Sequence, residues 1–171
     1  MGALSTGARS AITLVVLLVL LLAGAAWGFS AAFAPFPGKV DSPLCVDRSV
    51  AKGTRVFPAD VTVSVYNAGT REGLAGRVMQ ELIDAGFKQG VDANARPGTN
   101  VARVVIWASD RRNPAVALVA SRLGGHPRVV KRATLGPGVN VVVGDRFTKV
   151  VKGPRAVVAA HAATICSPPV D

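Results

Sequence analysis

The sequence is poor in the side chains that build many nucleic-acid surfaces and catalytic sites. Aromatic residues make up 5% of its 171 residues, and it holds ten acidic residues, two cysteines and two histidines. So few aromatic side chains disfavour a surface on which bases stack, and we expect no nucleic-acid partner. Charged residues make up 18% of the chain, below the usual quarter, and half of it is hydrophobic. This composition excludes a disordered charged tail and a coiled coil, and the length fits one domain with appendages.

A long stretch near the N-terminus has no charge. No charged residue occurs in residues 10–38, whose core reads ITLVVLLVLLL. About 20 such residues in a helix span the hydrocarbon core of a bilayer. The pattern predicts an uncleaved signal anchor over residues 11–36, after a cytoplasmic stub at residues 1–10 that contains Arg9. A cleaved signal peptide is the alternative, although the run exceeds the usual apolar length of about 7–15 residues. A buried helix of a soluble protein is a third interpretation, but nothing downstream is apolar enough to cover it.

The two cysteines flank the rest of the chain. Cys45 follows the apolar stretch, and Cys166 lies near the C-terminus. In an exported chain, an even pair of this kind predicts a disulfide. The loop that it closes holds about 120 residues, for which chain-entropy estimates give about 4–5 kcal/mol. Two unrelated free thiols are the alternative. No Cys-x-x-Cys or Cys/His spacing is present, so we expect no metal site.

Prolines and alternating patterns divide the remaining chain into three parts. Residues 37–60 are predicted to be an extended linker, because prolines interrupt any helix there. Residues 61–145 are predicted to form a compact domain, and residues 146–171 a basic tail that the disulfide ties back. The expected elements of the domain are a strand at 61–66, a helix at 71–85, strands at 87–93 and 101–107, a helix from Pro114 to Gly124-Gly125, and strands at 128–131 and 139–143.

This order, β-α-β-β-α-β-β, predicts a small two-layer α/β (α+β) domain after the N-terminal transmembrane helix. The first helix has one apolar stripe, and Pro114 after Asn113 is typical of a helix start. We expect one sheet, mainly antiparallel, with both helices on one face. The core is predicted to contain eight apolar residues: Leu74, Val78, Leu82, Val104, Ile106, Val119, Leu123 and Val141.

Four segments of the domain resemble the LytR C-terminal domain of Gram-positive envelope proteins. They are VSVYNAGTREGLAGRVMQELIDAGF at 63–87, VVIWASD at 104–110, the helix stop LGG at 123–125, and VVVGDRF at 141–147. The resemblance implies a role in cell-envelope integrity, without any established chemistry of the domain itself. A single N-terminal span, one such domain and flanking cysteines are also similar to the layout of mycobacterial envelope-integrity proteins.

The resemblance also bears on partners. We expect no LytR-Cps2A-Psr catalytic domain before this segment, because the chain is too short to hold one. The phosphotransferase activity of proteins with both domains is therefore not implied. The expected partners are the membrane, crossed once, and either cell-wall glycan or enzymes of the LytR-Cps2A-Psr type.

Candidate catalytic residues are few. His126 follows a helix stop, His161 lies in a run of Ala and Val, and neither has a nucleophile at a recognised spacing. Asp110 precedes two arginines, which is typical of a loop ion pair. No carboxylates resemble an acid/base couple, and the Gly-Leu-Ala-Gly segment at 73–76 lacks the Lys-Ser/Thr of a phosphate loop. We therefore predict a protein that is not an enzyme and has no cofactor.

The positive charge is more informative, since the formal net charge is +10. Each basic group near an anionic surface contributes about 1 kcal/mol, and salt screens this attraction. A solvated surface that keeps the domain soluble is the alternative. We expect a binding or scaffolding module for cell-wall assembly on the extracytoplasmic side of the cell membrane, or alternatively a direct binder of peptidoglycan or anionic glycan. The predicted anion-binding patch contains Arg128, Lys131, Arg132, Arg146, Lys149, Lys152 and Arg155.

Overall fold

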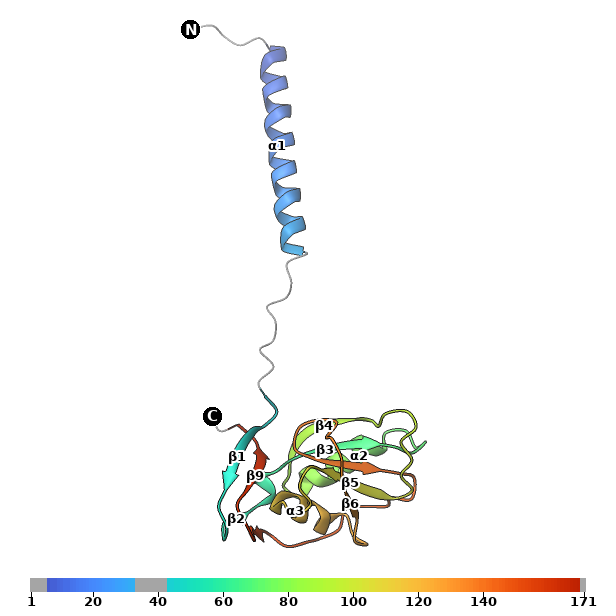
Figure 1. Ribbon diagram of the computed structural model, residues 1–171. Coiled ribbons are helices and arrows are strands. Elements are labelled where there is room, and N and C mark those ends of the chain that lie inside the picture. Colours follow the sequence, from blue (N-terminus) through green and yellow to red (C-terminus); the bar gives the residue numbers. More distant parts are fainter. Residues whose placement is uncertain (1–5, 33–42, 170–171) are drawn as a thin grey trace. The chain divides into compact units, whose positions relative to one another are not determined.

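The structure, a computed structural model, describes residues 6–32 and 43–169. It contains two units with a boundary between Val40 and Asp41, and each is described by itself. The first has one described helix, α1 (Thr6–Ala32), drawn in blue in Figure 1. The window Ile12–Phe29 has a mean hydropathy of 2.5 and is not buried within the protein, so α1 is long and apolar enough to cross a membrane.

These properties of α1 fit the predicted anchor, and a signal sequence meets the same criteria. The helix begins at Thr6, inside the segment predicted to be a cytoplasmic stub. Residues 1–5 of that stub, residues 33–36 of the predicted span and residues 37–42 of the predicted linker lie outside the described residues.

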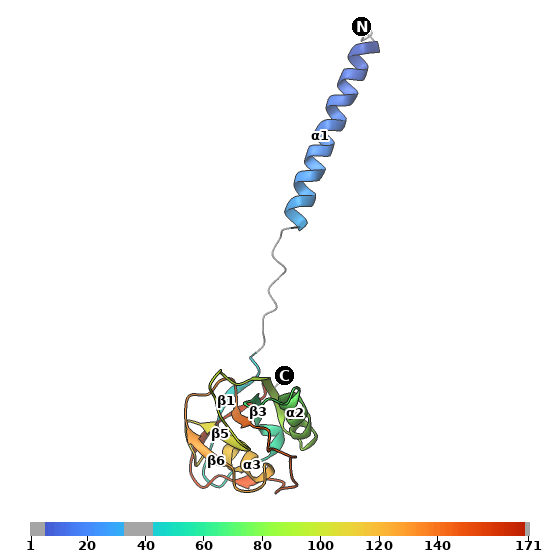
Figure 2. The ribbon, with the colours of Figure 1, turned by 90° about the vertical axis from the view of Figure 1, so that its right-hand side faces the viewer.

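The second unit is built on a mixed five-stranded sheet. Its helices, α2 (Leu74–Asp84) and α3 (Pro114–Arg122), follow the first and third strands, so the predicted order β-α-β-β-α-β-β is confirmed. The strands are β3 (Thr62–Asn67), β4 (Lys88–Asn94), β5 (Val104–Ala108), β6 (Arg128–Lys131) and β7 (Val139–Val143), and their order in the sheet is β4-β3-β7-β5-β6. Figure 2 shows α2 beside the sheet strand β3 and α3 beside the sheet strand β5.

The strand directions correct the expectation of a mainly antiparallel sheet. β3 pairs in parallel with β4 and with β7, β5 pairs in parallel with β6, and β5 pairs antiparallel with β7. The two helical crossovers explain the parallel pairs β3–β4 and β5–β6. Each helix returns the chain to the end of the sheet where the preceding strand began, so the next strand runs parallel to it.

Local sequence sets where both helices begin. The Asn113 side chain accepts a hydrogen bond from the Ala115 N–H at 2.9 Å, and Pro114 follows in the first turn of α3, as predicted. The helix α2 begins at Leu74, three residues later than predicted, because Gly73 has a φ of 67° at the N-cap position. Glycine adopts this left-handed conformation without steric cost, and it delays the start of the helix.

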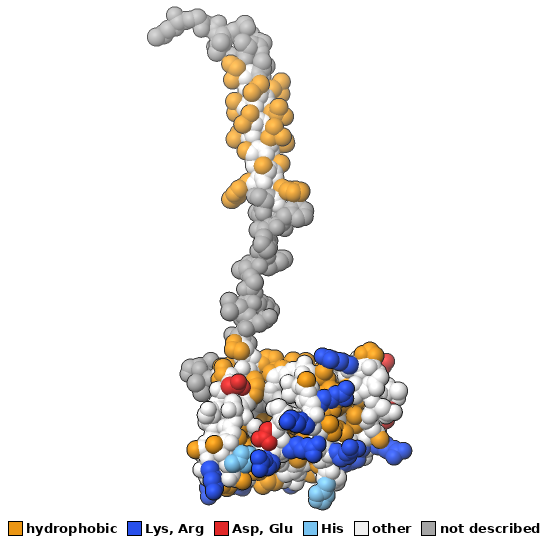
Figure 3. Space-filling model, in the orientation of Figure 1, with side chains coloured by type: hydrophobic (Ala, Val, Ile, Leu, Met, Phe, Trp, Pro, Cys, Tyr) orange, Lys and Arg blue, Asp and Glu red, His pale blue; other side chains and the backbone are white. Residues whose placement is uncertain are grey.

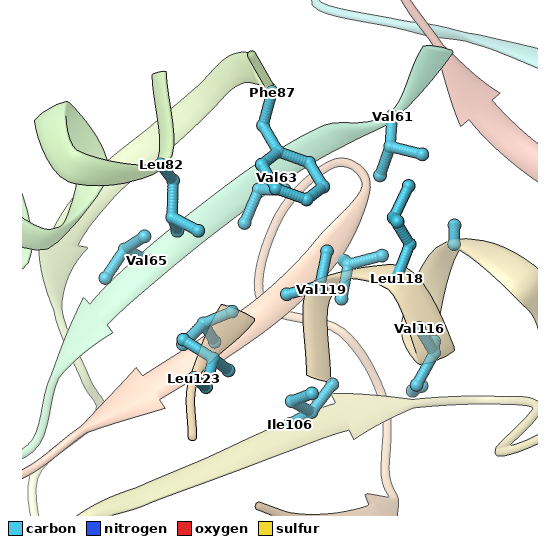
Figure 4. Packing of buried hydrophobic residues seen from close by; sticks show 14 of the residues in the cluster. Val61, Val63, Val65, Leu82, Phe87, Ile106, Val116, Leu118, Val119 and Leu123 are labelled. Carbon is cyan, nitrogen blue, oxygen red and sulfur yellow. The ribbon is translucent and has the colours of Figure 1, made fainter. Parts of the chain in front are cut away.

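Both helices bury their apolar stripes against one face of the sheet, which confirms the predicted arrangement. Figure 4 shows Leu82, Val119 and Leu123 packing into the same layer as Val63 and Val65 of β3. The main core of the second unit therefore lies between this face and the two helices. The eight predicted core residues are all at most 6% exposed: Leu74, Val78, Leu82, Val104, Ile106, Val119, Leu123 and Val141.

Two further strand pairs form outside the central sheet. β1 (Val46–Val50) pairs antiparallel with β9 (Ala163–Ser167), and β2 (Arg55–Val56) pairs with β8 (Val157–Val158). The prediction of an extended linker is therefore wrong for residues 46–60, and the predicted tail contributes β8 and β9 to the fold. Sequence reasoning missed these strands because their partners come from opposite ends of the second unit. Buried residues of these pairs and their neighbours join the main core: Val50, Val56, Ala159 and Ile165.

A disulfide joins Cys45, just before β1, to Cys166 of β9. The two Cα atoms are 5.4 Å apart, within the usual range for a disulfide, and the two residues are 121 positions apart in the sequence. We call β1, β9 and this disulfide the clasp. It holds both ends of the second unit at one place.

Candidate functional site

The sheet face opposite the helices carries a second, smaller apolar cluster. Its buried members are Tyr66, Trp107 and Val142, from β3, β5 and β7. They lie on this face because side chains alternate along a strand and the residue before each of them belongs to the main core. The loop of residues 95–103 crosses this face from β4 to β5, and two of its apolar side chains pack against the cluster.

A groove of about 420 Å³ lies between this loop and the segment that runs from β6 to Leu135. Trp107 of the small cluster forms part of its lining. Three arginines also line it: Arg96 from the loop, Arg128 from β6, and Arg132 just after β6. Among the described residues, no Asp or Glu lines it. We call it the arginine groove.

Strand alternation decides which basic residues of β6 reach the groove. In the β5–β6 pair, Arg128 lies beside Val105, which packs on the small cluster. Lys131 lies beside Ala108, which belongs to the main core on the other face. Arg128 and Arg132 therefore line the groove, and Lys131 does not.

Trp107 holds Arg132 in place. The guanidinium carbon of Arg132 lies 4.5 Å from the centroid of the Trp107 ring. A cation is attracted to the negative face of an aromatic ring, and a stacked guanidinium keeps N–H groups available at its edge. Trp107 is only 4% exposed, so it supports Arg132 rather than offering a free ring to a ligand.

The three groove arginines are exposed, and no carboxylate forms an ion pair with them in the part of the chain that the structure describes. Figure 3 shows Lys and Arg side chains gathering over the part of the second unit where Figure 1 places α3, β5 and β6. Positive charges in a concave site raise the local concentration of anions. The arrangement is therefore suited to binding an anion.

Arg146 of the predicted patch lines a neighbouring, shallower hollow of about 540 Å³. The two hollows share loop residues 98–101. Thr70 and Asp145 also line this second hollow, so it contains a negative charge that the arginine groove lacks.

The last three residues of the predicted patch lie on a segment that crosses the ends of the helices. The Val150 N–H donates to the Glu81 carboxylate of α2 at 2.6 Å, and the Val151 N–H donates to the Arg122 carbonyl of α3 at 2.7 Å. The structure thus brings Arg128 and Arg132 together and adds Arg96, which sequence reasoning missed because its position depends on the path of the loop. The basic residues of the crossing segment, all of them exposed, are Lys149, Lys152 and Arg155.

Asp145 holds the turn at residues 70–71 to the end of β7. Its Oδ1 accepts hydrogen bonds from the Thr70 N–H at 2.9 Å and the Arg71 N–H at 3.1 Å. The backbone hydrogen bond from Arg71, followed by those from Thr70, lowers the pKa of Asp145 below its ordinary value of 3.8.

This lowered pKa predicts a pH-dependent contribution to stability. A carboxyl group with a lower pKa in the folded state stabilises the fold above its ordinary pKa of 3.8 and stops doing so as the pH falls through the folded-state value. We expect Asp145→Asn to lower the free energy of unfolding near neutral pH, with the difference from the native protein shrinking in acid. Urea unfolding of both proteins at a series of pH values measures this. A difference that stays constant from about pH 6 to about pH 2 would contradict the role of the carboxylate.

Asp110 and His161, which are distant in the sequence, lie close together in the structure. His161 Nε2 lies 3.6 Å from Asp110 Oδ2, an ion pair when the histidine is protonated. The backbone hydrogen bond from Arg112, together with His161, lowers the pKa of Asp110. Both side chains are partly exposed, as expected of a loop pair, and His126 lies exposed in a loop with a φ of 51°. Over residues 6–32 and 43–169, no cluster of three or more His, Cys, Asp or Glu side chains is placed to hold a metal ion.

These features define a small α/β domain, joined by a disulfide at its ends, with an arginine groove on the open face of its sheet. Residues 60–147 match the LytR_C family, described as LytR cell envelope-related transcriptional attenuator. The match covers more than half of the chain, so the protein belongs to the LytR_C family, as the sequence resemblance predicted.

The chain is also similar to a solved structure, the soluble domain of a conserved hypothetical secreted protein (Rv2700 ortholog) from Mycobacterium marinum. The sequence identity is 25% and the TM-score 0.45, over 59% of this chain and 77% of that chain. A comparison with curated proteins gave no match. Family membership thus relates the domain to the cell envelope.

Proposed function

We propose that α1 anchors this protein in the cell membrane and that the second unit works on the extracytoplasmic side to maintain envelope integrity. There it acts as a non-enzymatic binding or scaffolding module for cell-wall assembly. The observation that carries the proposal is a cell-envelope-related LytR_C domain with an arginine groove that no described carboxylate lines.

The disulfide supports the extracytoplasmic location. Disulfides form and persist in oxidising compartments and are rare in the cytosol. The Cys45–Cys166 bond lies in the unit that follows α1, and α1 has the length and hydropathy of a membrane span. A cytoplasmic N-terminus therefore puts the disulfide-linked unit outside.

Direct binding of peptidoglycan or an anionic glycan is the second candidate function. The groove favours it, because three exposed arginines with no carboxylate partner among the described residues attract an anion. In the scaffolding alternative, the partner is a wall-assembly enzyme, such as one of the LytR-Cps2A-Psr type.

A crosslinker that does not cross membranes tests the proposal on intact cells that produce the full chain. Five exposed lysines of the second unit offer amines: Lys52, Lys88, Lys131, Lys149 and Lys152. We expect the protein to become linked to the wall or to a wall-assembly enzyme without lysis. Digestion of peptidoglycan releases a wall link, whereas a link to an enzyme persists as a larger protein species.

A variant without residues 6–32, retained in the cytoplasm, is the control and should not react in intact cells. Reaction of the full chain only after lysis would place the second unit inside the cell. That result would overturn the proposed function.

A further inference from the structure

We propose that the arginine groove binds a phosphorylated sugar unit of an envelope glycan, with Arg96, Arg128 and Arg132 holding the phosphate. This inference rests on the proposed function, because it needs the second unit outside the membrane, where such a glycan is accessible. It goes further by assigning one site and one chemical class of ligand.

The type of basic residue favours phosphate. The groove presents three arginines and no lysine. A guanidinium group is planar and donates parallel N–H hydrogen bonds that match two oxygens of a phosphate, whereas an ammonium acts as a point charge. Several guanidiniums in one groove together match the several oxygens and the charge of a phosphate.

The site is also organised before any ligand arrives. Arg132 is stacked at 4.5 Å on Trp107, and Trp107 is itself buried. A side chain held in its binding conformation loses less entropy when it binds a ligand. Trp107 is therefore a positioning residue, which acts on the ligand through Arg132.

The size and lining of the groove call for more than a bare phosphate. Sites for small organic ligands typically measure about 300–1,000 Å³, and the groove measures about 420 Å³. Thr99 and Asn100, from the loop of residues 95–103, add hydroxyl and amide groups to the lining. These groups form hydrogen bonds with the hydroxyls of a sugar.

A lipid headgroup in a membrane is the other source of phosphate, and the surroundings of the groove disfavour it. The large apolar side chains that the second unit exposes among its described residues are Leu44, Val46, Phe57 and Val158. None of them lines the groove. A surface that docks on a membrane typically inserts such side chains beside its basic residues. The groove instead combines arginines with polar loop residues in a concavity.

Two triple variants that remove equal charge test the site. The groove variant is Arg96→Gln, Arg128→Gln and Arg132→Gln, and the matched control is Lys149→Gln, Lys152→Gln and Arg155→Gln. The full chain in nanodiscs of neutral phosphatidylcholine is titrated with glucose 1-phosphate by calorimetry, with glucose and inorganic phosphate as further arms. We expect saturable binding of glucose 1-phosphate, weaker binding of inorganic phosphate and none of glucose. The groove variant should bind at least about tenfold more weakly, and the control within about twofold of the native protein.

A third variant with all three groove arginines changed to lysine separates geometry from charge. It keeps the net charge, so diffuse attraction predicts unchanged binding, whereas paired guanidinium hydrogen bonds predict a loss of several-fold. Thermal melting of each variant verifies that the fold is intact.

Equal losses in the two Gln variants would overturn the groove and favour the wider seven-residue patch. Failure of the native protein to bind glucose 1-phosphate would also overturn it. So would groove-dependent binding of phosphatidylglycerol vesicles without binding of the sugar phosphate. If the groove variant is still crosslinked to the wall or its enzymes on intact cells, the proposed function stands and the groove assignment fails.

Discussion

Loss of the disulfide is expected to destabilise the second unit by about 2–5 kcal/mol. Cys45→Ser and Cys166→Ser should each have this effect, because the bond joins residues 121 positions apart and restricts the unfolded chain strongly. The free energy of unfolding, measured with urea on the oxidised native protein and on both variants, gives the result directly.

The double variant Cys45→Ser, Cys166→Ser is the matched control, since it lacks the same disulfide as each single variant. It should lose as much stability as each single variant, and reducing agent should change none of the three. Peptide mapping without reduction that finds two free thiols in exported protein would contradict the disulfide. Equal stability of the oxidised and reduced native protein would contradict its energetic role.

Truncation of Leu82 to alanine should cost about 2–5 kcal/mol of unfolding free energy. Leu82 has no exposed surface and packs from α2 into the main core. Its removal leaves a cavity between the helix and the sheet, where the close-packed neighbours cannot collapse fully. Urea or thermal unfolding measures the change.

Val158→Ala is the comparison for Leu82→Ala, because Val158 is 58% exposed. Its cost should stay below about half a kcal/mol, as for most surface substitutions. Equal costs at the two positions would mean that α2 does not use this stripe to pack.

The helices and their order could be predicted because their signals are local. The apolar stripe of α2 and the Asn113-Pro114 start of α3 lie within a few residues of the elements that they define. The hydrophobic pattern predicts the helices between the strands, but the expectation of mainly antiparallel strands is wrong. A helix between two neighbouring strands normally makes those strands parallel, and this rule carries more weight than the hydrophobic pattern.

The strand pairs β1–β9 and β2–β8 and the arginine groove depend instead on contacts between distant residues. β2 and β8 are each two residues long, and their pairing gives no local signal. In β6, Arg128 and Lys131 lie on opposite faces of the sheet, because side chains alternate along a strand and these two residues are three positions apart. The position of Arg96 could not be predicted from the sequence, since only the path of the loop across the sheet brings Arg96 to β6.

The clasp also determines how the second unit responds to tension. Val46 pairs with Ser167 at the end of the β1–β9 pair that lies next to the disulfide. A pull applied through the chain that precedes Cys45 reaches that end first, where strands without a crosslink separate one hydrogen bond at a time. The covalent bridge divides the load between β1 and β9 before it reaches their hydrogen bonds. The fold is thus reinforced at the point where such a force enters it.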